Sequence, residues 1–273
     1  MSLSYLIMGV LNVTPDSFSD GGRYVSVDKA IEQAIVMASE GAHIIDVGGE
    51  SSRPGAAPVS VIEELDRVAP VIERLSQLVD VRISIDTRKY EVARDAVALG
   101  ATIVNDISGG ADPRIAELAR DNSLDVVLMH MKGTPETMQL SPDYPRGVVT
   151  EVKSFLSDRV RAFEELGLAP DRIWVDPGIG FGKRLDDNLE LLRALHELSD
   201  VGGRLVIGTS RKSFLAALLN DVQLPMELRR EGTLASNLWA AQQGATVFRV
   251  HEVGPLARAL KTWSACEGRH RSR

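Results

Sequence analysis

The sequence predicts an α/β protein in which a single (β/α)8 TIM barrel carries its active site at the C-terminal ends of the strands. Eight short runs rich in Val and Ile alternate with longer amphipathic stretches, a pattern typical of parallel strands covered by helices. A Gly-Ala pair comes just before three predicted strands, at 41–42, 100–101 and 244–245. A polar residue follows each strand run. An open, doubly wound sheet is the alternative, but polar side chains at all eight ends favour a barrel, which brings them to one face.

The predicted strands are short, apolar and bounded by Gly, Asp, Asn or Pro, as expected of buried parallel strands. In chain order they cover residues 6–11, 44–47, 81–85, 102–104, 126–129, 173–175, 205–207 and 246–250. The predicted helices repeat apolar residues at helical spacing, as Leu65, Val68, Ile72 and Leu75 do. In chain order the helices cover residues 27–39, 61–78, 89–99, 113–120, 148–166, 185–198, 212–219, 228–243 and 254–263.

The length and the composition fit one barrel domain. The chain has 273 residues, of which 44% are apolar and 25% are charged, and these proportions exclude wholesale disorder. A chain of this length can bury a large core. We therefore expect a single domain over residues 1–273, with a core at about 5–263 and a flexible tail at 264–273.

Charge and cysteine content exclude several classes of protein. The formal net charge of −7 argues against a nucleic-acid partner and against binding to an anionic membrane surface. The single cysteine, Cys266, excludes a disulfide framework and a multi-cysteine metal site. The first apolar run, 6–11, is too short to span a membrane and lacks a basic flank, so we expect a cytoplasmic protein.

The residues at or just after the strand ends carry the chemistry of the predicted site. One polar residue after a strand is often only a helix cap or a turn residue. Polar groups at all eight ends indicate instead one shared functional face. These groups are Asn12, Asp46 with Glu50, Asp86, Asn105, His130, Asp176, Lys212, and Arg249 with His251.

A glycine-rich segment at 178–183 follows the sixth predicted strand. It is not a P-loop, because its spacing is one residue short and Arg184 stands where Ser or Thr is required. It is not a dinucleotide-binding fingerprint either, because the third glycine is misplaced. Two interpretations remain open, a loop that only bends the backbone and a loop that shapes the floor of the site.

The motifs at these strand ends resemble those of the dihydropteroate synthase family. Residues 8–22 (MGVLNVTPDSFSDGG) and 46–56 (DVGGESSRPGA) resemble its first two signatures. The remaining motifs follow in the family's order, as SIDT at 84–87, VNDISGG at 104–110, LMHM at 128–131, DPGIGFGK at 176–183, GTSRKSF at 208–214 and RVH at 249–251. The resemblance covers about residues 5–262. One departure is Ser52, where many members carry Thr, and both residues offer a hydroxyl.

The resemblance implies a transferase of folate biosynthesis. Such an enzyme joins 4-aminobenzoate to 6-hydroxymethyl-7,8-dihydropterin pyrophosphate and releases pyrophosphate and 7,8-dihydropteroate. It implies Mg2+ as cofactor and a homodimer, for which residues 227–239 and 254–263 are the predicted contact. The reaction needs no protein nucleophile. Pyrophosphate leaves in an SN1-like displacement, and the electron-rich pterin spreads the positive charge left on its methylene.

The resemblance also assigns roles to individual residues. It places Asp86, Asn105, Asp176 and Lys212 on the pterin, while Arg249 is suited to stacking on the ring and to pairing with phosphate. The other assignments are Ser52, Arg53 and His251 on the pyrophosphate, Phe18, Pro54 and Ser213 around the aminobenzoate, and Asn12 on Mg2+. The predicted catalytic residues are Asp86, Lys212, Arg249 and His251.

Two other functions remain as alternatives. A non-catalytic paralogue would bind pterin without turnover, although the gaps in the first two signatures that it would normally show are absent. Another barrel enzyme, such as a pterin-dependent methyltransferase or an aldolase-like lyase, is the second alternative. A lyase of that kind would need a desolvated lysine inside a strand, whereas Lys212 follows one.

Overall fold

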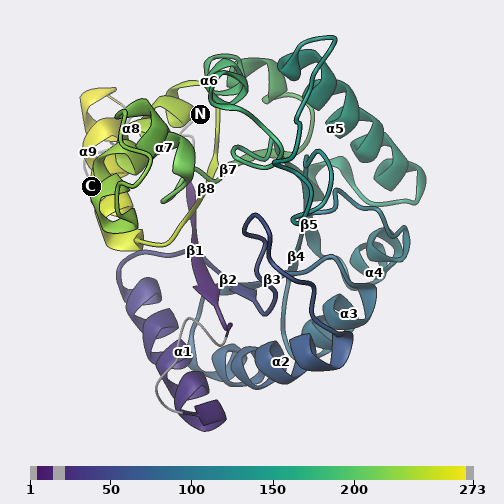
Figure 1. The fold of residues 1–273 in the computed structure, drawn as a ribbon. Helices are drawn as coiled ribbons and strands as arrows, with labels where there is room; N and C mark the ends of the chain where they lie inside the picture. Colours follow the sequence, from purple (N-terminus) through teal and green to yellow (C-terminus); the bar gives the residue numbers. More distant parts are fainter. Residues whose placement is uncertain (1–4, 15–21, 269–273) are drawn as a thin grey trace.

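The computed structural model describes residues 5–14 and 22–268. Within them, eight parallel strands pair in chain order and the last pairs with the first, which closes a barrel (Figure 1). The strands are β1 (Leu6–Asn12), β2 (Ile44–Gly48), β3 (Arg82–Asp86), β4 (Ile103–Asp106), β5 (Asp125–Met129), β6 (Ile173–Asp176), β7 (Arg204–Ile207) and β8 (Val247–Val250). The predicted barrel is confirmed, the open sheet is excluded, and the strand bounds differ from the prediction by at most two residues.

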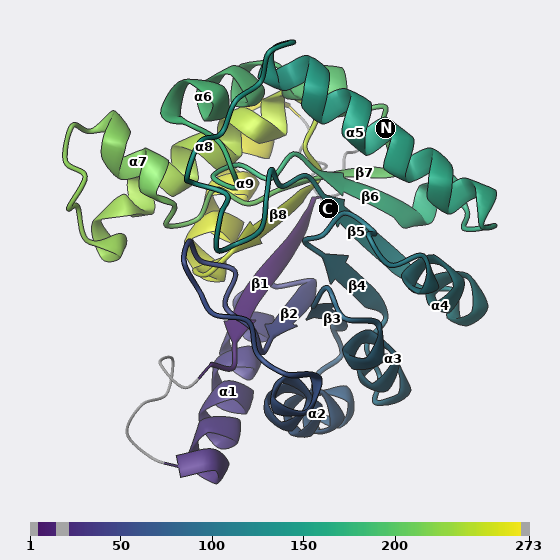
Figure 2. The ribbon, with the colours of Figure 1, turned by 45° about the vertical axis from the view of Figure 1, so that its right-hand side comes forward.

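The helices form a ring outside the strands (Figures 1 and 2). They are α1 (Gly22–Ser39), α2 (Val61–Leu78), α3 (Tyr90–Ala98), α4 (Arg114–Asn122), α5 (Val148–Glu165), α6 (Leu185–Arg193), α7 (Ser213–Leu218), α8 (Arg230–Gln242) and α9 (Val253–Cys266). Short 3-10 helices are η2 (Pro170–Arg172), η3 (Leu195–Leu198) and η4 (Met226–Arg229). The glycines that follow α1, α3, α5 and α8 all adopt positive φ, namely Gly41, Gly100, Gly167 and Gly244.

Three details differ from the predicted helices. The stretch predicted as one helix at 185–198 is divided, because α6 ends before Ala194 and η3 follows. Helix α9 continues to Cys266, so the predicted tail begins inside a helix. Trp239, which lies in an apolar stretch of the sequence, is 44% exposed on α8, and its indole N–H donates to the carbonyl oxygen of Leu192.

The alternation of side chains along each strand places the polar residues inside the barrel. One apolar cluster joins Met8, Ile44, Ile103, Val127, Trp174, Val206 and Val247, which come from seven different strands. Residues two positions apart on a strand point to the same side. Asp46 therefore follows Ile44 into the interior, and Arg249 follows Val247. The apolar cluster closes the lower part of the barrel, and the polar residues lie above it, toward the C-terminal ends of the strands.

A second, larger apolar core fills the space between the strands and the helices. It includes Val47 and Ile85 on the outward side of the sheet and Val68, Ile72 and Leu75 on the inward face of α2, all fully buried. Ser60 caps α2, since its hydroxyl accepts a hydrogen bond from the backbone N–H of Glu63. In the described part of the chain, the helices are all too short or too polar to cross a membrane.

Candidate active site

A buried charge network forms the floor of the barrel mouth. The Nε atom of Arg249, on β8, lies 2.7 Å from Oδ2 of Asp46 on β2, and its Nη2 atom lies 2.6 Å from Oδ2 of Asp86 on β3. The side-chain amide of Asn105, on β4, donates to the same Asp46 oxygen over 3.1 Å. Asp46, Asp86 and Asn105 are buried. The closed barrel thus brings four separate strands onto one polar cluster.

This floor has capacity left for a ligand. The Oδ1 atom of Asp46 is buried and has no hydrogen-bond partner among the described residues. Such an orphaned acceptor costs free energy unless a ligand or water satisfies it. Burial raises the pKa of Asp86 to about 7 even though the neighbouring Arg249 charge opposes the shift, and the charge of Asp46 raises it further. The floor can therefore accept hydrogen bonds from a polar ring that reaches into the mouth.

Asp176 and Lys212 form the opposite wall. Asp176 ends β6 and its Oδ1 accepts a hydrogen bond from the backbone N–H of Gly178 over 2.7 Å. Burial raises the pKa of the Asp176 carboxyl, and the positive charge of Lys212 opposes that shift. Burial lowers the pKa of Lys212 to about 8, and the charge of Asp176 opposes this shift in turn. The two groups thus hold opposite charges on one side of the floor.

The glycine-rich loop after β6 supports this wall. Gly178, Gly180 and Gly182 all adopt positive φ, as a sharply bent loop requires. The ammonium of Lys212 donates to the carbonyl oxygen of Ile179 and lies 4.4 Å from the ring centre of Phe181. The loop therefore bends the backbone and also contacts a predicted site residue.

Several positive charges surround His251 at the rim. Its backbone N–H donates to the hydroxyl oxygen of Ser210 over 3.2 Å, and its Nδ1 lies 3.0 Å from the same oxygen. The Ser210 hydroxyl thus anchors both the backbone and the ring of His251, and the tautomer of the ring decides which group donates in the second contact. Burial lowers the pKa of His251 to about 3, and the charges of Arg249, Arg211, Arg53 and Lys212 lower it further. At neutral pH His251 is an uncharged donor in a cationic pocket.

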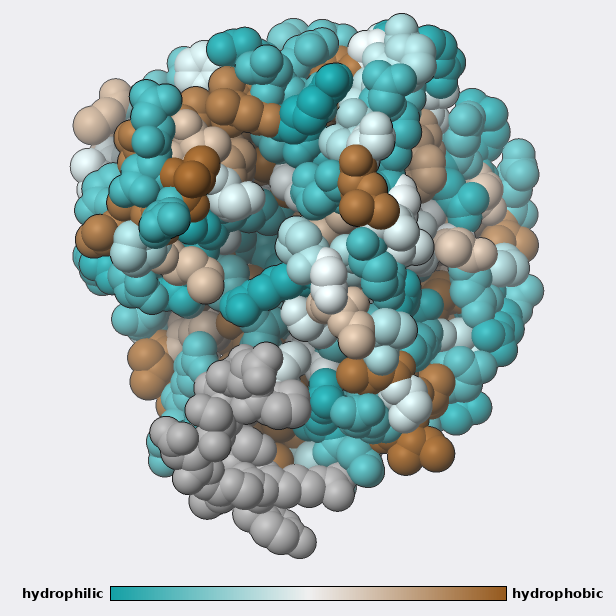
Figure 3. All heavy atoms as spheres, in the orientation of Figure 1, coloured by the Kyte–Doolittle hydropathy of each residue, from teal (hydrophilic) through white to brown (hydrophobic). Residues whose placement is uncertain are grey.

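The loop between β2 and α2 holds the other predicted rim residues. Arg53 and Pro54 are exposed and Ser52 is half-buried. The loop is fixed to the β5–α5 loop by one backbone hydrogen bond, from the N–H of Gly55 to the carbonyl of Pro135 over 3.0 Å. In Figure 1 this loop lies inside the ring of helices, and Figure 3 shows the same face hollowed near its centre among mainly hydrophilic residues.

The base of this loop is tied more firmly than its tip. The carboxylate of Glu50 pairs with Lys89 and with Arg88, and it accepts a hydrogen bond from the backbone N–H of Val59 over 3.3 Å. Lys89 also pairs with Glu64, which is fully buried. Glu50, at the start of the loop, therefore contacts both the end of the loop at Val59 and the segment just before α3.

Three further predicted residues have different outcomes. Asn12 ends β1 and is half-buried, and its side chain makes no hydrogen bond to a described residue. Ser213 is the first residue of α7 and is exposed, but this helix has only six residues, so its dipole offers little to an anion. Phe18 lies outside the described residues. No group of three or more His, Cys, Asp or Glu side chains in the described region could hold a metal ion.

The structure adds residues to which the sequence assigned no role. Asp46 pairs with Arg249, Arg211 lies in the cationic pocket, and Lys183 contacts His130 in the interior. The position of Asp46 and His130 at strand ends was the sequence feature that could have indicated a role in the site. Arg211 and Lys183 lie inside the recognised motifs, but nothing in their spacing shows which way the side chains point.

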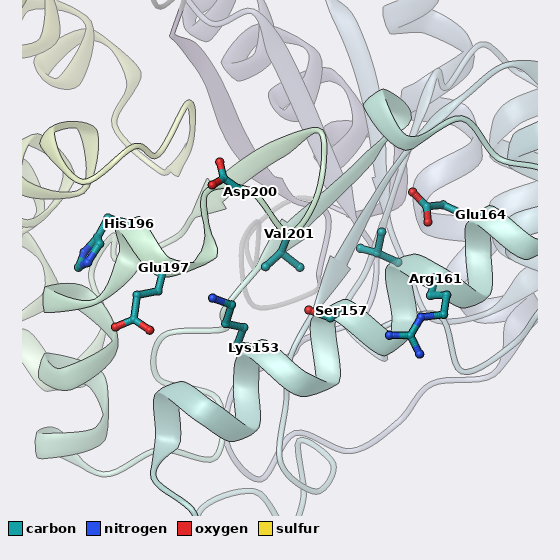
Figure 4. A pocket seen from close by; sticks show the side chains of 9 residues that line it. Lys153, Ser157, Arg161, Glu164, His196, Glu197, Asp200 and Val201 are labelled. Atoms are coloured by element: carbon teal, nitrogen blue, oxygen red, sulfur yellow. The ribbon is translucent and has the colours of Figure 1, made fainter.

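A groove elsewhere on the surface is a poor candidate for the site. It lies between α5 and the segment that includes η3, with a volume of about 420 Å3 (Figure 4). Its charged residues are Lys153, Arg161, Glu164, His196, Glu197 and Asp200. The charges are mixed, and the groove is formed by the helical layer rather than by the strand ends.

Comparison with known proteins identifies the family of the chain. A family model described as "Pterin binding enzyme" matches residues 8–251. The fold and the polar floor thus define a pterin-binding barrel enzyme. The chain is 47% identical to the dihydropteroate synthase of Escherichia coli K12 over 259 residues, which cover 95% of this chain and 90% of that protein. The chain belongs to the dihydropteroate synthase family.

Solved structures lead to the same family. The dihydropteroate synthase of Xanthomonas albilineans with 4-aminobenzoic acid has a TM-score of 0.90 and 42% identity, and the match covers 97% of this chain and 93% of that one. The enzyme from the same organism in complex with 7,8-dihydropteroate has a TM-score of 0.87 and 40% identity, with 98% and 95% covered.

Proposed function

We infer that this chain condenses 4-aminobenzoate with 6-hydroxymethyl-7,8-dihydropterin pyrophosphate, which gives 7,8-dihydropteroate and pyrophosphate. The observation that carries this function is the buried floor, where the pair Asp46 and Asp86, the amide of Asn105 and the guanidinium of Arg249 meet. The related enzymes of known structure hold an aminobenzoate and a dihydropteroate, the second substrate and the product of this reaction.

The floor is suited to a pterin because the ring edge carries N–H donors and ring acceptors. The free Oδ1 of Asp46 and the carboxylates of Asp86 and Asp176 can accept from the donors, while Lys212 can donate to an acceptor. The guanidinium of Arg249 is planar, and its two carboxylate partners fix its orientation. Its plane and charge suit it to the face of the pterin and to the pyrophosphate beyond.

The rim is suited to the leaving pyrophosphate. Arg53, Arg211 and His251 lie close enough for the two arginines to affect the imidazole pKa. We propose that the arginines stabilise the charge that develops on the pyrophosphate as the C–O bond breaks, and that the Nε2 proton of His251 donates to it. The positive charge left on the methylene is spread over the pterin ring. The neutral arylamine then attacks and needs no strong base.

We propose Mg2+ as the cofactor, with Asn12 as its protein ligand. The amide oxygen of Asn12 has no partner among the described residues, so it is available to an ion that takes its other ligands from phosphate and water. When bound, Mg2+ would supply charge stabilisation for the leaving group. Calorimetry should find Mg2+ binding only when pyrophosphate is present. Tight Mg2+ binding without pyrophosphate would contradict this proposal.

We propose that the aminobenzoate lies between the pterin site and the β2–α2 loop, with Pro54 and Ser213 beside it. Both are exposed and lie on the face at the strand ends, so neither needs to leave a packed position to contact a substrate. Closure of the loop over the mouth would keep water from the carbocation-like methylene. Phe18, which lies outside the described residues, has the same proposed role from the family resemblance.

A steady-state assay with both substrates and Mg2+ tests the main proposal. We expect pyrophosphate release that depends on 4-aminobenzoate, with 7,8-dihydropteroate formed in equal amount. Pterin binding by calorimetry without any turnover would favour the non-catalytic paralogue instead.

We also propose that the chain forms a homodimer through the region of α8 and α9. Exposed apolar side chains gather on α7, η4, α8 and the connecting segment, namely Leu218, Leu219, Val222, Met226, Leu228 and Trp239. Helices α8 and α9 contact each other, so the predicted segments 227–239 and 254–263 can share one face. Sedimentation should give a dimer, and Leu228→Asp should shift it to a monomer. A monomeric wild type would refute the proposal.

A further inference from the structure

A buried lysine joins the loops that follow β5 and β6. Lys183 is 3% exposed, and its Nζ lies 2.9 Å from Nδ1 of His130 and 3.0 Å from the carbonyl oxygen of Phe181. The carbonyl oxygen of His130 is a third, longer contact at 3.4 Å. Lys183 forms no salt bridge with any described residue. Burial lowers the pKa of Lys183 to about 7, and the charge of Asp176 opposes this shift. Burying an amine of this kind costs free energy, so it is expected only where it has a specific role.

The chemistry of the pair fixes its hydrogen bond. In its charged form Lys183 can only donate, so Nδ1 of His130 then accepts and the ring proton lies on Nε2. Burial and the charge of Lys183 lower the pKa of His130 to about 3, which agrees with a neutral ring. The imidazole is held in turn by Phe155, whose ring meets it edge-on at a centroid distance of 5.0 Å. The pair is therefore a defined contact inside a packed region.

The backbones of the two loops lie directly against each other around this contact. A Cβ atom on Gly178 would come within 1.9 Å of the carbonyl oxygen of His130, and one on Gly182 within 2.5 Å of the carbonyl oxygen of Lys132. The hydroxyl of Tyr144 donates to the carbonyl of Gly182 over 2.7 Å. The β6–α6 loop is thus seated on the β5–α5 loop.

The same β6–α6 loop determines where Lys212 lies. The carbonyl of Ile179 accepts a hydrogen bond from the Lys212 ammonium, and the Phe181 ring lies beneath it. The carbonyl of Phe181 is also an acceptor for Lys183. A Cβ on Gly180 would come within 3.1 Å of Cδ of Lys212, so the loop and this side chain are in close contact.

We propose that Lys183, through its contacts with His130 and Phe181, is a positioning residue that holds the β6–α6 loop so that Lys212 faces the pterin. Lys183 itself does not touch the substrate. This proposal rests on the function proposed above and extends it to one further residue. It requires that Lys183 act through Lys212 rather than through its charge, which also lowers the pKa of Asp176. Lys183→Gln removes that charge and so separates the two routes.

A double-mutant cycle tests that requirement. Lys183→Met shortens the side chain by one heavy atom and removes its three N–H donors. We expect K183M to weaken binding of the pterin pyrophosphate about tenfold by calorimetry, and K212M to weaken it at least as much. In the K183M/K212M double variant the affinity should equal that of K212M within about twofold, because residues that act through one another are not additive.

Two other variants distinguish positioning from a general loss of structure. Lys153→Met is the matched control, since this lysine is exposed on α5 and lines the groove outside the barrel, away from the β6–α6 loop. It should bind pterin as the wild type does. Lys183→Gln keeps two N–H donors and should recover affinity to within about threefold of the wild type. If K183M does not fold, the cycle is repeated with Lys183→Leu, which also removes the N–H donors.

Wild-type affinity in K183M, or losses that add up in the double variant, would overturn the proposal. Failure of the proposed function has a different signature: the wild type would bind pterin and give no dihydropteroate. The calorimetric cycle can be read in either case, because it does not depend on turnover.

Discussion

The floor of the barrel mouth and the β2–α2 loop contribute to one site but are built differently. In the floor, Asp46 and Asn105 are 0% and 5% exposed, and Arg249 joins Asp46 to Asp86. In the loop, Arg53 and Pro54 are exposed, and a single backbone hydrogen bond at Gly55 attaches the tip to a neighbouring loop. The floor is ordered during folding, whereas the loop must be ordered further when its ligand binds.

This difference predicts an order of binding. A preorganised floor can bind a pterin without meeting a further ordering cost. A ligand that needs the loop in one conformation has its apparent affinity reduced by the fraction of molecules in that conformation. The pterin pyrophosphate contacts both regions in the proposed arrangement, so it can order the loop for the aminobenzoate. The following experiments test or refine this contrast.

The largest effect should come from removing a charge from the floor. In Arg249→Met, Asp46 and Asp86 remain buried without their counter-ion, so the free energy of unfolding should fall by about 3 kcal/mol. In Arg53→Met, the same substitution on the exposed loop, it should change by no more than about 0.5 kcal/mol. Urea unfolding followed by circular dichroism measures both values.

The pH dependence of this loss adds a second check. Without Arg249 the pKa of Asp86, already raised to about 7 by burial, should rise further. Protonation would then relieve part of the cost at pH 6, so the destabilisation should be greater at pH 8. Equal losses in the two arginine variants would contradict the contrast between floor and loop.

Removing one floor carboxylate should weaken the pterin without unfolding the protein. Asp86→Asn and Asp176→Asn each replace a charged acceptor with a neutral amide, and a hydrogen bond to a charged group contributes about 1.5–3 kcal/mol. Pterin affinity should fall at least about tenfold. Calorimetry measures the affinity, and circular dichroism checks the fold. Asp200→Asn, in the groove outside the barrel, is the control. Unchanged affinity in both floor variants would remove these residues from the pterin pocket.

The loop should determine aminobenzoate binding rather than pterin binding. Titration of 4-aminobenzoate into the free protein should give little heat, and pyrophosphate with Mg2+ should restore binding. Arg53→Ala should reduce the restored affinity at least about fivefold and leave pterin affinity nearly unchanged.

The control for this experiment is Arg161→Ala, which removes an exposed arginine from α5. It should leave both affinities unchanged. Aminobenzoate affinity that is the same with and without pyrophosphate would rule out a pocket assembled by the loop.

The sequence predicts the floor better than it predicts the pairs within it. Strand periodicity and polar strand ends are enough to place Asp46, Asp86 and Asn105 on one face, because a closed barrel brings all strand ends together. The pairing of Asp46 with Arg249 joins residues 203 positions apart in the chain and depends on the closure of β8 onto β1. No local pattern contains that information.

Other features fall outside sequence prediction for different reasons. Lys183 looks like a surface lysine by composition, since lysine is rarely buried, yet the bent backbone of its loop turns it inward. Trp239 lies in an apolar pattern but faces outward, since an apolar stripe does not reveal whether it faces the core or the surface. The loop residues 52–54 were identified only through the family resemblance.

The smallest predicted effect concerns the pH dependence of pterin affinity, through Lys212 on the wall beside the floor. Burial lowers the pKa of Lys212 to about 8. The protonated, positively charged form of this side chain is the one proposed to donate to the pterin. The protonated fraction of Lys212 falls about fourfold between pH 7 and pH 8.5, while the charged fraction of Asp86, whose pKa is about 7, rises about twofold. Pterin affinity should therefore fall about twofold as pH rises. In Lys212→Met this decline should disappear, and an equal decline in that variant would assign it to another group.

Aminobenzoate affinity, measured with pyrophosphate and Mg2+ present, should change less over the same range, because its proposed walls at Pro54 and Ser213 carry no ionisable side chain. A parallel decline of both affinities would mean that the floor and the loop respond as one unit, and it would contradict the contrast drawn between them.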